Sequence, residues 1–97
     1  MPIYIHLVKV TAQAVRNLKA FNAMLDDAKR VVEENGGKVV NSYSTLGKYD
    51  LVVVLEFPDN ATAMKVSALI AAQGNFQPLT LAAIPPREFG KALAKAK

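Results

Sequence analysis

Two hydrophobic stretches with a two-residue period lie in the middle of the chain, on either side of a glycine. Asn41 to Phe57 is typical of two strands folded back on each other with the bend at Gly47, because β-branched and aromatic residues flank a residue that adopts positive φ without strain. The second arm is apolar at alternate positions and also between them, which predicts a strand that needs cover on both faces. We expect the rest of the chain to be organised around this hairpin.

A strand and then a helix are predicted before the hairpin. Ile3 to Val10 alternates in the manner of a strand. From Thr11 to Asn35 hydrophobic residues recur every three or four positions, and two glycines follow as a C-terminal stop. The pattern fits a continuous helix capped at Thr11, and it also fits a short turn that ends near Asn22 before a fresh helix begins.

The hairpin arms are predicted as strands over Lys38 to Leu46 and Tyr49 to Phe57. A second amphipathic helix follows, with an N-cap signal in Pro58-Asp59-Asn60 and an end at Gly74.

The last predicted strand runs from Phe76 to Ile84, and Pro78 within it belongs at a sheet edge or a bulge because it lacks a backbone donor. Pro86 is suited to open a short final helix. In that helix Phe89 and Leu93 are four residues apart, so we expect them to dock on the body or on a neighbour.

The element order is therefore βαββαβ. This order predicts an α+β fold, the ferredoxin-like plait, in which an antiparallel sheet carries both helices on one face. We expect one domain over residues 1–84, followed at 85–97 by a short C-terminal helix and a basic tail.

The face of the sheet opposite the helices is expected to be open. The residues assigned to the helix side are Ile3, Ile5, Leu7, Leu51, Val53, Leu55, Leu79 and Leu81. The residues left on the open face are Tyr4, His6, Val8, Val10, Asp50, Val52, Val54 and Glu56. Burying four such aliphatic side chains contributes on the order of 5 to 10 kcal/mol per chain, so two copies are expected to pair sheet to sheet as a dimeric α/β barrel.

The run LGKYDLVVV carries a resemblance to a known family. Gly47, Tyr49 and Asp50 match the Gly-x-Tyr-Asp signal of the GYD domain family, small stand-alone proteins of largely unassigned role. Further similarity extends over nearly the whole chain, including Val15-Arg16-Asn17-Leu18 and Gly36-Gly37-Lys38-Val39. The resemblance implies the dimeric barrel fold and no agreed reaction. The same signal before an apolar strand is similar to the ligand-binding domain of the feast/famine amino-acid regulators, which supports small-molecule binding by analogy of architecture.

Charge and composition exclude several classes of function. The net charge is +4, with 8 Lys/Arg against 7 Asp/Glu in residues 1–84 and 4 against 1 in residues 85–97. The basic excess therefore sits in a solvated tail, and a nucleic-acid surface is not predicted. Cysteine is absent and histidine occurs once, so we expect neither thiolate chemistry nor a metal site, and no cofactor. With no apolar run long enough to span a membrane and no leader-like segment, we expect no membrane association and a cytoplasmic protein.

The candidate catalytic pair is His6 with Asp50, or His6 with Glu56, because a carboxylate beside an imidazole raises its basicity and orients it for proton abstraction. The alternative is structural. His6 then lies hydrogen-bonded at a dimer interface, Glu56 lies near a cation, and Asp50 accepts backbone N–H bonds and holds the bend.

The candidate ligand-binding residues share aromatic or titratable side chains at the hairpin or on the open face. They are Tyr4, His6, Tyr43, Tyr49 and Asp50. Tyrosines at a barrel mouth would provide an apolar wall and polar anchors for a flat organic molecule, although half-buried sheet tyrosines have the same pattern.

Two further groups offer weaker chemistry. Arg16 and Asn17 are placed to hold a carboxylate or phosphate near a helix start. The Met-Pro-Ile opening resembles that of tautomerases, which implies Pro2 as a general base after removal of the initiator methionine. The three functions these observations predict are a homo-oligomer that binds a small organic molecule, a cofactor-independent isomerase, decarboxylase or monooxygenase, and a purely structural oligomer.

Overall fold

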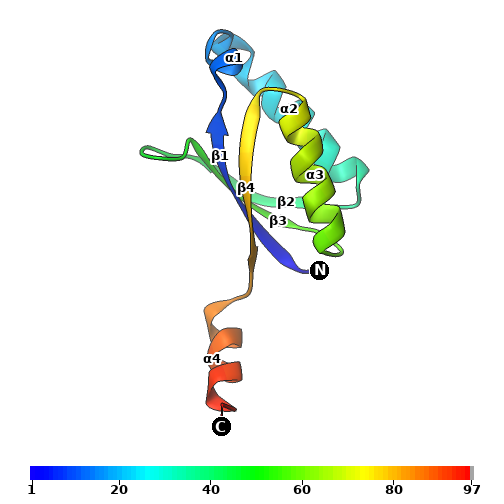
Figure 1. Ribbon diagram of the computed structural model, residues 1–97, viewed down its shortest axis with the longest axis vertical. Coiled ribbons are helices and arrows are strands. Elements are labelled where there is room, and N and C mark those ends of the chain that lie inside the picture. Colours follow the sequence, from blue (N-terminus) through cyan, green and yellow to red (C-terminus); the bar gives the residue numbers. More distant parts are fainter. Residues whose placement is uncertain (97) are drawn as a thin grey trace.

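The structure, a computed structural model, describes residues 1–96. A four-stranded antiparallel sheet has the strand order β2-β3-β1-β4, and two main helices cover one of its faces (Figure 1). The elements in chain order are β1 Ile3–Val10, α1 Ala12–Val15, the 3₁₀ turn η1 Leu18–Ala20, α2 Phe21–Glu34, β2 Lys38–Ser44, β3 Leu51–Glu56, α3 Asn60–Ala72, β4 Phe76–Ala83 and α4 Pro86–Ala94. This arrangement confirms the α+β ferredoxin-like plait.

The first helical segment is broken, which resolves the alternative left open by the sequence. The Thr11 side chain caps α1 by accepting a hydrogen bond from Ala14 N. A 3₁₀ turn then leads into α2, which begins at Phe21 without a side-chain cap. The Phe21 ring packs edge-on against Phe76 with the centroids 6.1 Å apart. The new start therefore lies at an aromatic contact with β4, one residue before Asn22.

The hairpin strands are shorter than predicted. Strand β2 ends at Ser44 and β3 begins at Leu51, so residues 45–50 form a loop rather than a continuation of the two arms. Gly47 has φ +108°, as expected at the bend. Thr45 closes the loop, since its N–H donates to Asp50 O and its hydroxyl donates to Tyr49 O.

The register corrects the predicted faces of β1 and β4. In β1 the even-numbered residues are buried under the helices, because His6 lies opposite Val53 and Tyr4 opposite Leu55. In β4, Leu79 and Leu81 lie opposite Leu7 and Ile5 on the uncovered side. The assignment of Ile3, Ile5, Leu7, Leu79 and Leu81 to the helix side was wrong, as was the placement of Tyr4, His6, Val8 and Val10 on the open face, whereas the faces of β3 were predicted correctly.

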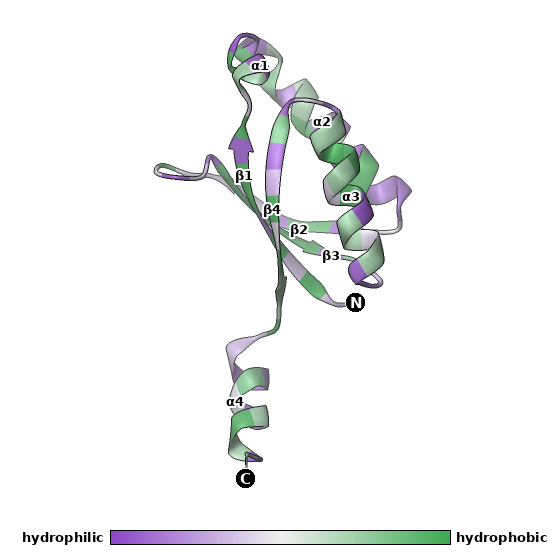
Figure 2. Cartoon of the chain, in the orientation of Figure 1, coloured by the Kyte–Doolittle hydropathy of each residue, from purple (hydrophilic) through white to green (hydrophobic). Residues whose placement is uncertain are grey.

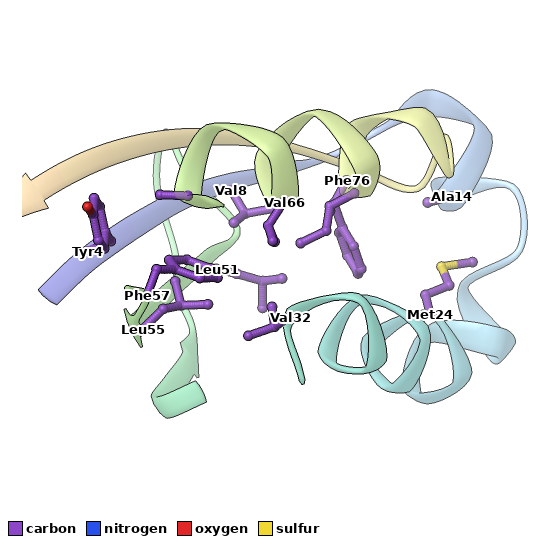
Figure 3. Packing of buried hydrophobic residues seen from close by; sticks show 12 residues of the cluster. Tyr4, Val8, Ala14, Met24, Val32, Leu51, Leu55, Phe57, Val66 and Phe76 are labelled. Carbon is purple, nitrogen blue, oxygen red and sulfur yellow. The ribbon is translucent and has the colours of Figure 1, made fainter. Parts of the chain in front are cut away.

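The core lies between the helices and the even-numbered face of β1 (Figure 3). Its most deeply buried large side chains are Phe57, Leu55, Val32 and Val66. The α3 helix begins at the Asp59 cap, where the carboxylate accepts from Thr62 N, and α3 lies over β4. As Pro78 requires, β4 is an edge strand.

The last helix stands apart from the body. The α4 helix begins at Pro86 as predicted and extends away from the sheet in Figure 1. Phe89 and Leu93 are 54% and 56% exposed, so within residues 1–96 they do not dock on the body. Lys97 of the predicted basic tail lies outside the described residues. No helix of residues 1–96 is long and apolar enough to cross a membrane.

Candidate functional site

A cavity of about 150 Å³ lies between the sheet and helices α2 and α3. All four strands contribute to its floor, and most of its wall is aliphatic or aromatic. Representative wall residues are Leu25, Val32, Leu51, Val53, Ile70 and Phe76. Asp26 and Lys29 of α2 lie with Ser42 where the cavity meets the surface.

His6 brings a titratable group to the wall of this cavity. Its side chain is only 3% exposed, and burial lowers the pKa of the imidazole to about 4. The ring is therefore neutral at pH 7. A general base works best with a pKa near the operating pH, so an imidazole with this lowered pKa is a poor general base at pH 7.

A short polar chain orients the His6 ring. Nε2 lies 3.3 Å from the Ser67 hydroxyl on α3, and Ser67 also hydrogen-bonds Thr80, which lies opposite His6 on β4. Neither Ser67 nor Thr80 lines the cavity. The Nε2 edge of the ring therefore faces the helix, and Nδ1 has no described hydrogen-bond partner.

The proposed acid–base pairs are not assembled. Asp50 is exposed at the end of the hairpin loop, where Oδ2 accepts from Val10 N at 2.8 Å and its own N–H donates to Val8 O. Asp50 thus holds the bend, as the structural alternative predicted. Glu56 lies opposite Ile3 on the uncovered face of the sheet, with Lys38 opposite it on β2. His6, on the helix side, has neither carboxylate beside it.

The candidate tyrosines occupy three separate places. Tyr4 is buried, donates to Asn60 Oδ1 at 2.5 Å and packs edge-on against Phe57. It joins β1 to the start of α3. Tyr43 is 61% exposed and lies opposite Val52 on the uncovered face. The ring of Tyr49 lies at the bend with two lysine ammonium groups within 6 Å. Of the five candidate ligand residues, the structure places His6 at the cavity wall.

Sequence reasoning missed Ser67, the side chain that orients the His6 ring. Ser67 carried a usable signal, because it is four residues after Ala63 and three before Ile70, on the inward stripe of α3. A hydroxyl on that stripe needs a buried partner, and the single histidine supplies it. The cavity-lining residues Leu25, Ala28 and Val32 of α2 lie on the predicted apolar stripe of that helix, a pattern that indicates a buried face and does not distinguish a cavity from a filled core.

The structure brings no further functional side chain to the two weaker candidate sites, Arg16 with Asn17 and Pro2, within residues 1–96. Arg16 and Asn17 are exposed on the connection after α1. Pro2 is exposed beside an open hollow near the start of α4, where the charged residue among the described lining groups is Glu88 rather than an arginine. Over residues 1–96 no group of three or more potential metal ligands comes together.

The uncovered face of the sheet is the second notable surface. Figure 2 shows the hydrophobic colour along much of β3. The side chains that form this open apolar face are Ile5, Leu7, Val52, Val54, Leu79 and Leu81. Leu79 and Leu81 are 47% and 41% exposed. A monomer of this size rarely leaves such a contiguous surface in water.

These features define a small ferredoxin-like α+β domain with an internal cavity and an apolar sheet face. The chain belongs to the GYD domain family, whose pattern matches residues 4–93, and this confirms the resemblance seen at Gly47, Tyr49 and Asp50. It is also similar to a Thermus thermophilus protein named "Glutamine synthetase and cystathionine beta-lyase binding protein". The two are 33% identical over 86 residues, which cover 88% of this chain and 90% of the relative.

Proposed function

We propose that this GYD-domain protein is a cytoplasmic, homodimeric binding protein that pairs through its open apolar face and binds other proteins with its outer surfaces. The open apolar face is the observation that carries the proposal. It combines six aliphatic side chains from three adjacent strands, while the charged residues lie at its ends and on the helices. Two such faces pack at about 10 Å to form a core between two sheets.

The energy of this pairing supports a dimer. Each of the six side chains is already partly covered by its neighbours, so its burial contributes about 1 kcal/mol rather than the full value for an exposed leucine. Twelve side chains in a pair then contribute about 12 kcal/mol, against an association cost of roughly 4–15 kcal/mol. With an association cost at the low end of this range, the net gain of about 8 kcal/mol corresponds to a dimer of micromolar affinity.

Light scattering coupled to size exclusion tests the pairing, with Val54→Glu as the disruptive variant. A carboxylate at the centre of the face would be buried without a partner, so the variant should run as a monomer. Met64→Glu is the matched control, because Met64 is 71% exposed on α3 and away from the sheet. A wild-type monomer at high concentration, or an unchanged dimer in Val54→Glu, would refute the pairing.

The proposal of enzyme partners is supported by the similarity to the Thermus thermophilus protein, whose name states that it binds glutamine synthetase and cystathionine beta-lyase. We expect this chain to bind one of these two enzymes from its own organism. Surface plasmon resonance with each purified enzyme provides the measurement. A dimer presents two equivalent sites, so the Val54→Glu variant should bind a multimeric enzyme more weakly than the wild-type protein does. Absence of binding to both enzymes removes this part of the proposal and leaves the dimer intact.

A second candidate function is the binding of a small molecule in the cavity. It is supported by a 150 Å³ apolar space with one oriented polar group, His6, on its wall. The cavity lies on the helix side of the sheet, so pairing through the other face leaves it accessible. Native mass spectrometry of the purified protein is the test, and a bound molecule displaced by a cavity-filling variant is the expected result.

A further inference from the structure

The chemistry of the cavity wall defines which molecules fit. Leucine, valine, isoleucine and phenylalanine side chains form most of the surface, and His6 is its buried titratable group among residues 1–96. The charged groups on the lining, Asp26 and Lys29, belong to the exposed side of α2. Because Asp26 and Lys29 lie where the cavity meets the surface, an ionised ligand group in the deeper, apolar part would lose its hydration without an opposite charge beside it.

The volume limits the size of the occupant. Apolar cavities of about 150 Å³ hold a molecule the size of benzene. A nucleotide or a cofactor with several rings is larger than this volume and would extend out of the open side of the cavity. The occupant is therefore a compound with roughly six to eight non-hydrogen atoms inside the cavity.

One polar contact is available for orientation. The Ser67 hydroxyl lies 3.3 Å from Nε2 of His6 and orients the ring, and Nδ1 of this cavity-lining residue has no described hydrogen-bond partner. In a neutral imidazole Nδ1 either donates or accepts one hydrogen bond. A hydroxyl group satisfies both cases, because it can accept as well as donate.

We propose that the cavity binds an uncharged, single-ring molecule bearing one hydroxyl group, with the ring against the aliphatic wall and the hydroxyl hydrogen-bonded to His6 Nδ1. The proposal rests on the second function above and adds the chemical class of the ligand. It assigns a role to the single histidine of the chain that needs no adjacent carboxylate.

Four probes of similar shape test the class: phenol, toluene, benzoate and benzylammonium. Each is titrated into the intact protein at pH 7 and followed by NMR of the His6 imidazole and the Val53 methyl groups. Phenol should bind saturably and perturb both residues. Toluene should bind about fivefold more weakly because it lacks the hydrogen bond. Benzoate and benzylammonium should bind at least about tenfold more weakly because a charge must enter an uncharged wall.

Two pairs of variants separate the cavity from the rest of the surface. Ala28→Leu fills the cavity and should abolish phenol binding, whereas Ala23→Leu changes an exposed residue of the same helix that does not line the cavity. His6→Gln places its amide near the position of Nε2 and should lose the preference for phenol over toluene. His6→Asn places its amide near Nδ1 and should retain that preference. The melting temperature of each variant verifies that it is folded.

The outcomes distinguish this inference from the function on which it rests. Benzoate or benzylammonium bound as tightly as phenol, and blocked by Ala28→Leu, overturns the uncharged class while small-molecule binding stands. Phenol binding that Ala28→Leu leaves unchanged places the probe outside the cavity and overturns the inference. No binding of any probe, together with no copurified molecule by native mass spectrometry, overturns both.

Discussion

The burial of His6 predicts that the protein loses stability in mild acid. In the folded protein the pKa of the imidazole is lowered to about 4 by desolvation, whereas in the unfolded chain it returns to 6.5. Between these values the unfolded chain binds a proton that the folded protein does not. Stability is therefore fully present above pH 6.5, falls as the pH drops through 6, and levels off near pH 4.

The size of the effect follows from the same two values. The interval from 6.5 to about 4 corresponds to about 3 kcal/mol of unfolding free energy. A domain of this length has roughly 5–15 kcal/mol in total, so a fifth or more of its stability should be lost over this interval. Carboxylates add their own effect mainly below it. The depressed pKa of Asp59, caused by hydrogen bonds from the Thr62 side chain and backbone, contributes stability that is lost as the pH falls further.

Urea denaturation followed by circular dichroism, at pH steps between 7.5 and 4 and at one protein concentration, measures the loss. The matched control is His6→Gln, which keeps an amide near Ser67 and removes the titration, so its stability should be nearly flat over this interval. Since the chain has one histidine, NMR also gives its pKa directly. A His6 pKa near 6.5, or the same acid loss in His6→Gln, would refute the reasoning.

Three further predictions concern the backbone and the terminal helix. A Cβ on Gly37 would lie 2.5 Å from the Phe57 ring, so Gly37→Ala should destabilise the fold by about 1–3 kcal/mol in urea, whereas Gly90→Ala meets nothing and should not. Asp50→Ala removes the acceptor that holds the end of β1 and should cost about 1 kcal/mol, while Asp50→Asn, which keeps an acceptor oxygen, should cost less; equal losses would contradict this role. Removal of residues 86–97 should leave the body folded by far-UV circular dichroism and its urea midpoint little changed, because α4 forms no described hydrogen bond with the sheet. Loss of cooperative unfolding in the shortened chain would contradict this prediction.

Much of the fold could be read from local patterns. The strand at Ile3 to Val10 agrees with the structure to the residue, and the N-cap at Asp59 and the helix start at Pro86 lie where the sequence predicted them. These features depend on backbone chemistry within a few residues, so they survive without tertiary information. The hairpin strands were predicted too long because Thr45 and Asp50 close a wider loop than the apolar pattern indicates.

The candidate site was harder to predict because both sides of β1 are apolar. In β1, Ile5 and Leu7 are as hydrophobic as Tyr4 and Val8, so the period of two identifies a strand without choosing its buried side. The choice placed His6 on the wrong face and beside the wrong partners. Its true partner, Ser67, is 61 residues away in the sequence.

The amino-acid sequence alone determined the order of strands and helices, the position of the bend and membership of the GYD family, because periodicity, caps and a short motif are local properties. Only the tertiary structure decided which side of each strand faces the helices, since that depends on the pairing of His6 with Val53 and Thr80. The same strand pairing determines the lining of the cavity, the orientation of the imidazole and the residues of the open apolar face. Each is a relation between strands and helices distant in sequence.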